Sequence, residues 1–152
     1  MPDLAAGTVV KGGDTPPTVN DSEAGSYTFT ITAYGVATTG GTYADCGVAF
    51  VAPTSGRVEI THAATVSNST TGGTQVAPAV RTGGTVGSGT SVLAAANINR
   101  VVKVGTEAIR AGVPTFVSGL TPGSTYNVRL EHCVSTGTGT ALERTVTVKP
   151  CT

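Results

Sequence analysis

Two segments of this sequence have the form of a strand, a tight turn and a second strand, at residues 48–60 and 119–128. Pro53 and Gly56 bracket the first turn, and Pro122 and Gly123 lie together in the second. Alternating apolar residues interrupted by such turn residues are typical of antiparallel sheet. No cluster of acidic, histidine or thiol side chains accompanies either turn, so the sequence indicates a scaffold rather than a reaction.

The same alternation of apolar and polar residues continues along most of the chain. From Tyr27, apolar side chains alternate with Thr, which predicts a strand with a threonine outer face. Pro78 is expected to place its strand at a sheet edge or a bulge. No amphipathic helix is found, so we predict an all-β, antiparallel β-sandwich that is jelly-roll-like. Strands are expected at 27–33, 48–52, 58–66, 76–81, 92–104, 114–118, 126–134 and 142–148.

Composition narrows the possible partners. The chain has 152 residues, only 12% of them charged, and a formal net charge of zero with no Lys or Arg run. We therefore expect no nucleic acid and no membrane surface as a partner. The longest apolar runs are too short to cross a bilayer, and the start of the chain lacks the pattern of a secretory signal. Synthesis and folding in a cytoplasm are expected.

The first 24 residues differ from the rest. Residues 12–18 and 20–23 contain few core-forming side chains, and Pro16 and Pro17 favour an extended course. We therefore predict an extended N-terminal arm at 1–24 and a β-sandwich domain at 25–152, with the arm held by an assembly partner. The candidate partner-binding residues of the arm are Leu4, Thr8, Val9, Val10, Lys11, Pro16 and Pro17.

The residues that carry metal chemistry are sparse. His62 and His132 lie on the apolar faces of their strands, where the flanking positions are apolar and supply no further ligand. We expect no metal and no cofactor; hydrogen-bonded histidines, inside the sandwich or at a subunit contact, explain the pattern, and their adjacency is left open. Three cysteines have no metal-ligand spacing and are expected to be thiols, although a pair between Cys46 and Cys133 is left open.

Catalytic patterns are also missing. The Gly-x-Ser-x-Gly turn of serine hydrolases does not occur between a strand and a helix, and the nine acidic residues are scattered singly. Three acidic residues fall on predicted strands with arginines nearby; they are Glu59, Glu131 and Glu143, with Arg57, Arg129 and Arg144. These charges are expected to form cross-strand ion pairs on a solvated or interfacial sheet face. We predict that the chain is not an enzyme.

Two family resemblances follow from these phrases. Residues 119–126 resemble the turn before a core Tyr in fibronectin type III modules, which are shorter and usually carry a core Trp that this chain lacks. A longer resemblance rests on residues 4–10 with 14–17, 48–60, 68–70, 80–90, 120–132 and 146–150. These segments resemble small structural proteins of actinobacterial tailed phages, whose sandwich is similar to the tumour-necrosis-factor-like jelly roll.

The second resemblance implies a virion protein made in the host cytoplasm. It implies a capsid decoration protein that assembles as a homotrimer, with the major capsid protein or tail components as partners. The alternatives are a minor tail or fibre protein, and a receptor-binding or carbohydrate-binding module. Sugar platforms use exposed aromatic rings, and Tyr34 and Tyr43 are the candidates for a glycan contact.

Overall fold

Strand β5 (Val58–Asn68) shows how the sequence pattern becomes a layer of the fold. In the computed structural model, which describes residues 15–151, every second side chain of β5 is buried, from Val58 through Ile60 to Val66. The intervening side chains are exposed or half-buried. A strand with this period-two burial covers a core on one side only. β5 therefore lies in one layer of a two-layered structure.

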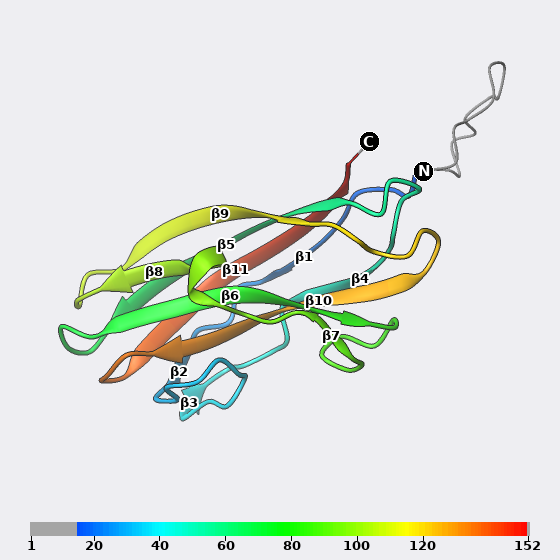
Figure 1. Cartoon of the computed structure of the whole chain (residues 1–152). Helices are drawn as coiled ribbons and strands as arrows, with labels where there is room; N and C mark the ends of the chain where they lie inside the picture. The colour runs from blue at the N-terminus through cyan, green and yellow to red at the C-terminus, as the bar shows by residue number, and fades with distance from the viewer. Residues whose placement is uncertain (1–14, 152) are drawn as a thin grey trace, which may run out of the picture.

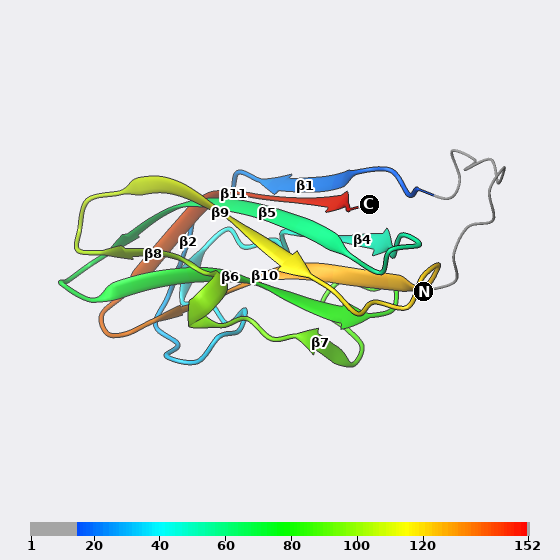
Figure 2. The same ribbon diagram turned by 45° about the horizontal axis from the view of Figure 1, so that its top comes forward.

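The strands form two antiparallel sheets that pack face to face, as Figures 1 and 2 show. Sheet A has the order β3-β2-β11-β5-β9, with β1 also paired to β11. Sheet B has the order β4-β10-β6-β7, with β8 also paired to β6. The bounds are β1 Val19–Glu23, β2 Tyr27–Phe29, β3 Gly40–Gly41, β4 Gly47–Val51, β6 Gly73–Thr82, β7 Ser91–Leu93, β8 Val101–Val104, β9 Ile109–Val117, β10 Thr125–Val134 and β11 Gly139–Pro150.

The connections between these strands are those of a jelly roll. β1 and β2 share one position beside β11, and β7 and β8 share one beside β6. The layers then read β1/β2-β11-β5-β9 and β4-β10-β6-β7/β8. From β4 onward the chain changes layer at every connection except those from β6 through β7 to β8. The predicted all-β, antiparallel, jelly-roll-like sandwich is confirmed.

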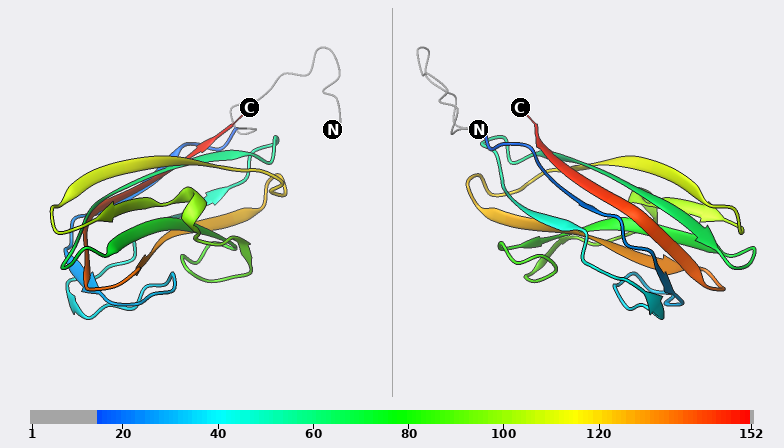
Figure 3. Two further views of the ribbon diagram at one scale, coloured as in Figure 1. Left: turned by 60° about the vertical axis from the view of Figure 1, so that its left-hand side comes forward. Right: turned by 180° about the vertical axis from the view of Figure 1, so that it is seen from behind.

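The N-terminal part of the chain enters this sandwich earlier than its composition indicates. β1 lies within the range assigned to the arm, yet it pairs with β11 from Val19↔Val148 to Glu23↔Arg144 (Figure 3, right). Its backbone hydrogen bonds order a segment whose side chains bury little. Residues 1–14 of the arm lie outside the described residues.

Three strand predictions are corrected by the structure, and the first is that the strand expected at 27–33 ends at Phe29. Pro78 lies in β6, which is not an edge strand; β7 pairs with its last residues and β8 with its first, so Pro78 falls between them. The missing N–H of proline is tolerated there because that stretch of β6 has no second partner. The single strand expected at 92–104 is two short strands, separated by the 3₁₀ turn Asn97–Asn99.

A bulge interrupts β11 where β1 gives way to β2. The register of β11 against β5 shifts between Leu142 and Thr145, and Glu143 has a φ of 48°. A non-glycine residue at positive φ is uncommon and is held there by its surroundings. Arg144 keeps the alternation of Val146 and Val148 and is fully buried, and beyond the bulge Ala141 is buried in place of Leu142.

The three cysteines are free thiols, and Cys46 and Cys133 do not form a disulfide. Burial raises the pKa of Cys46 to about 12, so this thiol is neutral and unreactive at physiological pH. In the part of the chain that the structure describes, no helix has the length and apolarity needed to cross a membrane.

Candidate interaction surface

The outer face of sheet B is covered by two long connections. Residues 31–46 extend its edge beyond β4, with backbone bonds from Leu130 N to Cys46 O and from Val134 N to Ile31 O (both within 2.9 Å). Residues 83–90 lie over β10. They are held by Asn127, which is fully buried and whose amide donates to Gly83 O and Ser88 O. Outward side chains of β10 are therefore buried beneath the chain's own loops.

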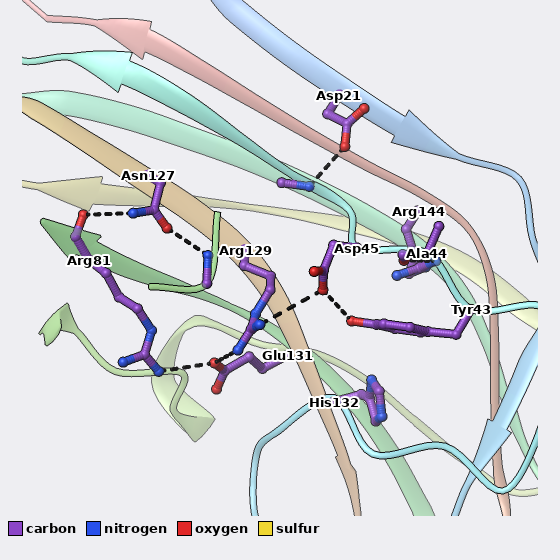
Figure 4. A network of polar contacts seen from close by, with 12 residues as sticks. Asp21, Tyr43, Ala44, Asp45, Arg81, Asn127, Arg129, Glu131, His132 and Arg144 are labelled. Atoms are coloured by element: carbon purple, nitrogen blue, oxygen red, sulfur yellow. Dashed lines mark hydrogen bonds and ion pairs between the residues drawn. The ribbon is translucent and has the colours of Figure 1, made fainter. Parts of the chain in front are cut away.

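A polar network fills the space beneath these connections (Figure 4). The Glu131 carboxylate lies 3.3 Å from Arg81 Nη2 and 3.2 Å from Arg129 Nη2, and it is nearly buried. Arg129 also lies 3.9 Å from Asp45, whose carboxylate accepts a hydrogen bond from Tyr43. Glu131 forms the predicted cross-strand ion pair, with Arg81 on β6, but its carboxylate is nearly buried and not on a solvated face. The charges of this pair therefore stabilise the fold and are not presented to a partner.

The outer face of sheet A has no such cover. Its central positions carry only small, uncharged side chains, two from each of the strands β1, β5, β9 and β11. We call this set the open face; it consists of Asn20, Ser22, Thr61, Ala63, Gly112, Pro114, Thr145 and Thr147. These residues are exposed or half-buried, whereas their inward neighbours, such as Ile60 and Val146, are fully buried.

The two ends of the open face differ. At one end Glu59 lies beside Phe116, which is 72% exposed, and Lys149 is the neighbouring outward residue on β11. At the other end, Arg110 and Glu143 form an exposed ion pair of 3.7 Å across β5. They line a hollow of about 380 Å³ with Ser22–Ala24, Arg144 and Thr145.

Arg144 does not form the surface ion pair that was predicted for it. It faces inward in phase with Val146, and its guanidinium lies 4.5 Å from the centre of the Tyr27 ring and 5.2 Å from that of Tyr43. Its Nη2 donates to Ala44 O at 2.9 Å. Contact with aromatic faces offsets part of the cost of burying this cation. The residue closes the sandwich edge between β1 and β2.

The two histidines lie in different sheets and have different surroundings. Nε2 of His132 donates to Ala37 O at 3.0 Å, which leaves Nδ1 to accept from the Tyr27 hydroxyl at 3.1 Å. His62, on β5, is fully buried and neither ring nitrogen has a hydrogen bond of normal geometry, although the carbonyls of Val76 and Val113 are near. Burial lowers the pKa of His62 to about 4 and also lowers that of His132. Both are neutral at pH 7.

The remaining candidates do not form a site. No group of three or more His, Cys, Asp or Glu side chains within 15–151 is arranged to hold a metal ion. Tyr34 and Tyr43 are half-buried, and their hydroxyls bond Gln75 and Asp45. Of the predicted arm residues, Pro16 is half-buried and Pro17 exposed. Leu4, Thr8, Val9, Val10 and Lys11 lie outside the described residues.

Comparison with known proteins supplies the fold but no family. No family model matches the chain, and no curated protein matches it. A chain of the T13 viral particle of IBDV matches with a TM-score of 0.56 and 14% identity, over 90% of this chain and 31% of that one. This chain therefore spans about a third of that relative's length, and the likeness shows a shared fold alone.

Two further solved structures are more distant. Eiger TNF from S. frugiperda has a TM-score of 0.44 and 7% identity, over 89% of this chain and 94% of that one. The CBM22-1 xylan-binding domain from Paenibacillus barcinonensis Xyn10C has a TM-score of 0.37 and 11% identity, over 86% and 94%. Likenesses this distant carry no argument about activity or partners.

Proposed function

We propose that this chain is a non-enzymatic structural protein of a tailed bacteriophage particle, which decorates the capsid by binding shell subunits and further copies of itself. The observation that carries the proposal is the open face of sheet A. A jelly roll that covers one sheet with its own loops and leaves the other bare has one surface suited to a protein partner.

The chemistry of the open face favours such a contact. Small hydroxyl, methyl and glycine positions give a flat surface, and none of its eight residues carries a charge that would have to be desolvated. Charged residues are depleted in the cores of protein interfaces for this reason. Nucleic acid and anionic lipid are poor partners for this surface because it offers no cation in its centre.

The identity of the partner comes from the sequence resemblance. That resemblance is to phage virion proteins, and the fold is shared with a chain of a viral particle. The proposed partners are accordingly the major capsid protein or tail components, and the proposed location is the virion after folding in the host cytoplasm. A homotrimer is the copy number that the resemblance implies, and it stays a prediction.

We further propose that residues 1–14 bind a neighbouring shell subunit. Leu4, Val9 and Val10 supply apolar side chains, and an extended segment can add a strand to an exposed sheet edge through main-chain bonds. Ordering each residue costs roughly 1–2 kcal/mol, so the contact must be extensive. β1 anchors this segment, since its five residues are paired to β11.

Quantitative mass spectrometry of purified phage particles tests the function. Hundreds of copies per particle would support capsid decoration, and a handful would favour the tail or fibre alternative. Absence from the particles, together with recognition of a polysaccharide on a glycan array, would replace the proposal with a carbohydrate-binding role.

Deletion of residues 1–14 tests the arm. This deletion ends before β1, so the sandwich should keep its circular dichroism spectrum and melting temperature while binding to undecorated particles is lost. The matched control keeps the length of the chain and changes Leu4, Val9 and Val10 to Ser; it should lose binding too. Unchanged binding by both variants would contradict the arm proposal.

A further inference from the structure

The open face has a symmetry that its function as an interface does not require. A single line perpendicular to the strands can be drawn across the open face. On each strand, one outward residue of the open face lies on one side of this line and one lies on the other side. Thr61 and Ala63 flank this line on β5, Thr145 and Thr147 on β11, and the same line passes between Gly112 and Pro114 on β9. β1 continues it, because Asn20 pairs with Thr147 and Ser22 with Thr145.

We propose that two copies of this chain stack face to face through sheet A, related by a two-fold axis along this line. The inference rests on the proposed role in self-association and specifies its geometry. Such an axis lies in the interface and makes the strands of the two copies antiparallel, which is compatible with the aligned packing of two sheets. Each residue of one copy then faces, on the same strand of the other copy, the residue that lies at the same distance on the opposite side of the line.

Size complementarity supports this pairing at the centre. Thr61 of one copy lies over Ala63 of the other, and Pro114 lies over Gly112. A larger side chain therefore faces a smaller one on both strands, which is the condition for two sheet faces to interdigitate. No charge is buried at this centre.

Charge complementarity supports it at the ends. Lys149 lies three positions from the line on β11, and the Glu143 side chain reaches Thr65, three positions from the line on the other side, so Lys149 of each copy enters the hollow beside Glu143 of the other. Phe116 and Arg110 are related in the same way on β9. The exposed ring of Phe116 would be covered by a guanidinium, in the geometry of a cation–π contact.

The area is sufficient for a pair of modest affinity. Three strands about 30 Å long and β1, whose five residues extend about 17 Å, lie about 4.8 Å apart and cover on the order of 500 Å² per copy. Two copies would bury about 1,000 Å², which matches the roughly 1,000 Å² expected of a specific interface. A three-copy assembly through another surface would combine with this pair to give six copies.

The mass of the purified full-length protein at about 100 µM, measured by light scattering after gel filtration, tests the pair. Two or six copies are expected. Ala63→Arg places a large cation at the centre of the face and should abolish the pairing, whereas the control Thr85→Arg, in the exposed loop over sheet B, should leave it unchanged. Circular dichroism checks that both variants fold.

A charge exchange tests the orientation. Lys149→Glu and Glu143→Lys should each weaken association about tenfold, because each creates two like-charge contacts per pair. Mixing the two single variants, or combining them in one chain, should restore association to within about threefold of the original. Glu143 also contacts Thr65 and Arg110 within its own copy. If Glu143→Lys weakened association only by breaking these internal contacts, mixing the two variants would not restore it.

One or three copies, or a pair unaffected by Ala63→Arg, would overturn the inference. A pair that forms but shows no rescue would overturn the two-fold arrangement. Either result leaves the proposed function intact, since binding to phage particles is measured separately.

Discussion

The two outer faces of this sandwich are both formed by antiparallel strands, but one face is covered by loops and the other is exposed. On sheet B, outward residues such as Asn127 and Glu131 are larger and polar, and two connections cover and bond them. On sheet A the central outward residues are small and uncharged, and no described segment covers them. The difference indicates that stability and binding belong to different sheets. Polar groups on sheet B stabilise the fold, and the open face of sheet A is available to a partner.

The largest expected effect comes from detaching the cover of sheet B. In Asn127→Ala, the carbonyls of Gly83 and Ser88 and the N–H of Gly87 lose their partner in a buried position. We expect the free energy of unfolding to fall by about 3 kcal/mol, because several backbone groups are left unsatisfied. Urea denaturation measures it. A loss below about 1 kcal/mol would show that the cover is held by other contacts.

A second test uses low pH to protonate His62, which is buried on the inner face of sheet A, and so to lower the free energy of unfolding. The pKa of His62 is lowered to about 4 in the folded protein, against about 6.5 when unfolded, so the unfolded chain binds more protons between these values. The stability that this neutral residue provides is present above pH 6.5 and is lost as the pH falls. From pH 7 to pH 5 we expect a loss of about 2 kcal/mol from His62.

The lowered pKa of His132 adds to this loss with the same sign. His62→Leu should remove the His62 part and flatten the dependence of urea stability on pH. An unchanged slope in this variant would assign the pH effect to His132 or to the carboxylates instead.

The smallest expected effect is on the open face itself. Thr147→Ala removes a half-buried hydroxyl that forms no hydrogen bond within residues 15–151, so the free energy of unfolding should change by less than about 0.5 kcal/mol. Urea denaturation under the conditions used for Asn127→Ala gives the comparison directly. A loss as large as that of Asn127→Ala would mean that the open face supports the fold, and the contrast between the two sheets would be lost.

The sequence predicted the layers because period-two burial is a local property. Strand β5 alternates in the sequence as it does in the structure. The sequence did not predict which sheet stays bare, because the segments that cover β10 come from residues 31–46 and 83–90, far away in the chain. Spatial covering of this kind leaves no pattern within a strand.

Arg144 illustrates a second limit. Alternation with Val146 and Val148 places Arg144 on the buried face, but its charge favoured a surface ion pair. The groups that surround it inside include the ring of Tyr43 and the carbonyl of Ala44, which lie far away in the chain. Pro78 was misplaced for a related reason, since the gap between β7 and β8 that tolerates it is created by strands that come later in the sequence.

The pairing of β1 with β11 has a mechanical consequence. The five residue pairs from Val19↔Val148 to Glu23↔Arg144 join the N-terminal segment to a central strand of sheet A. A pull on that segment along the strand direction loads all five pairs together in shear, whereas a sideways pull opens them one after another from Val19. A tether attached in this way resists tension along one axis of the molecule and releases along another.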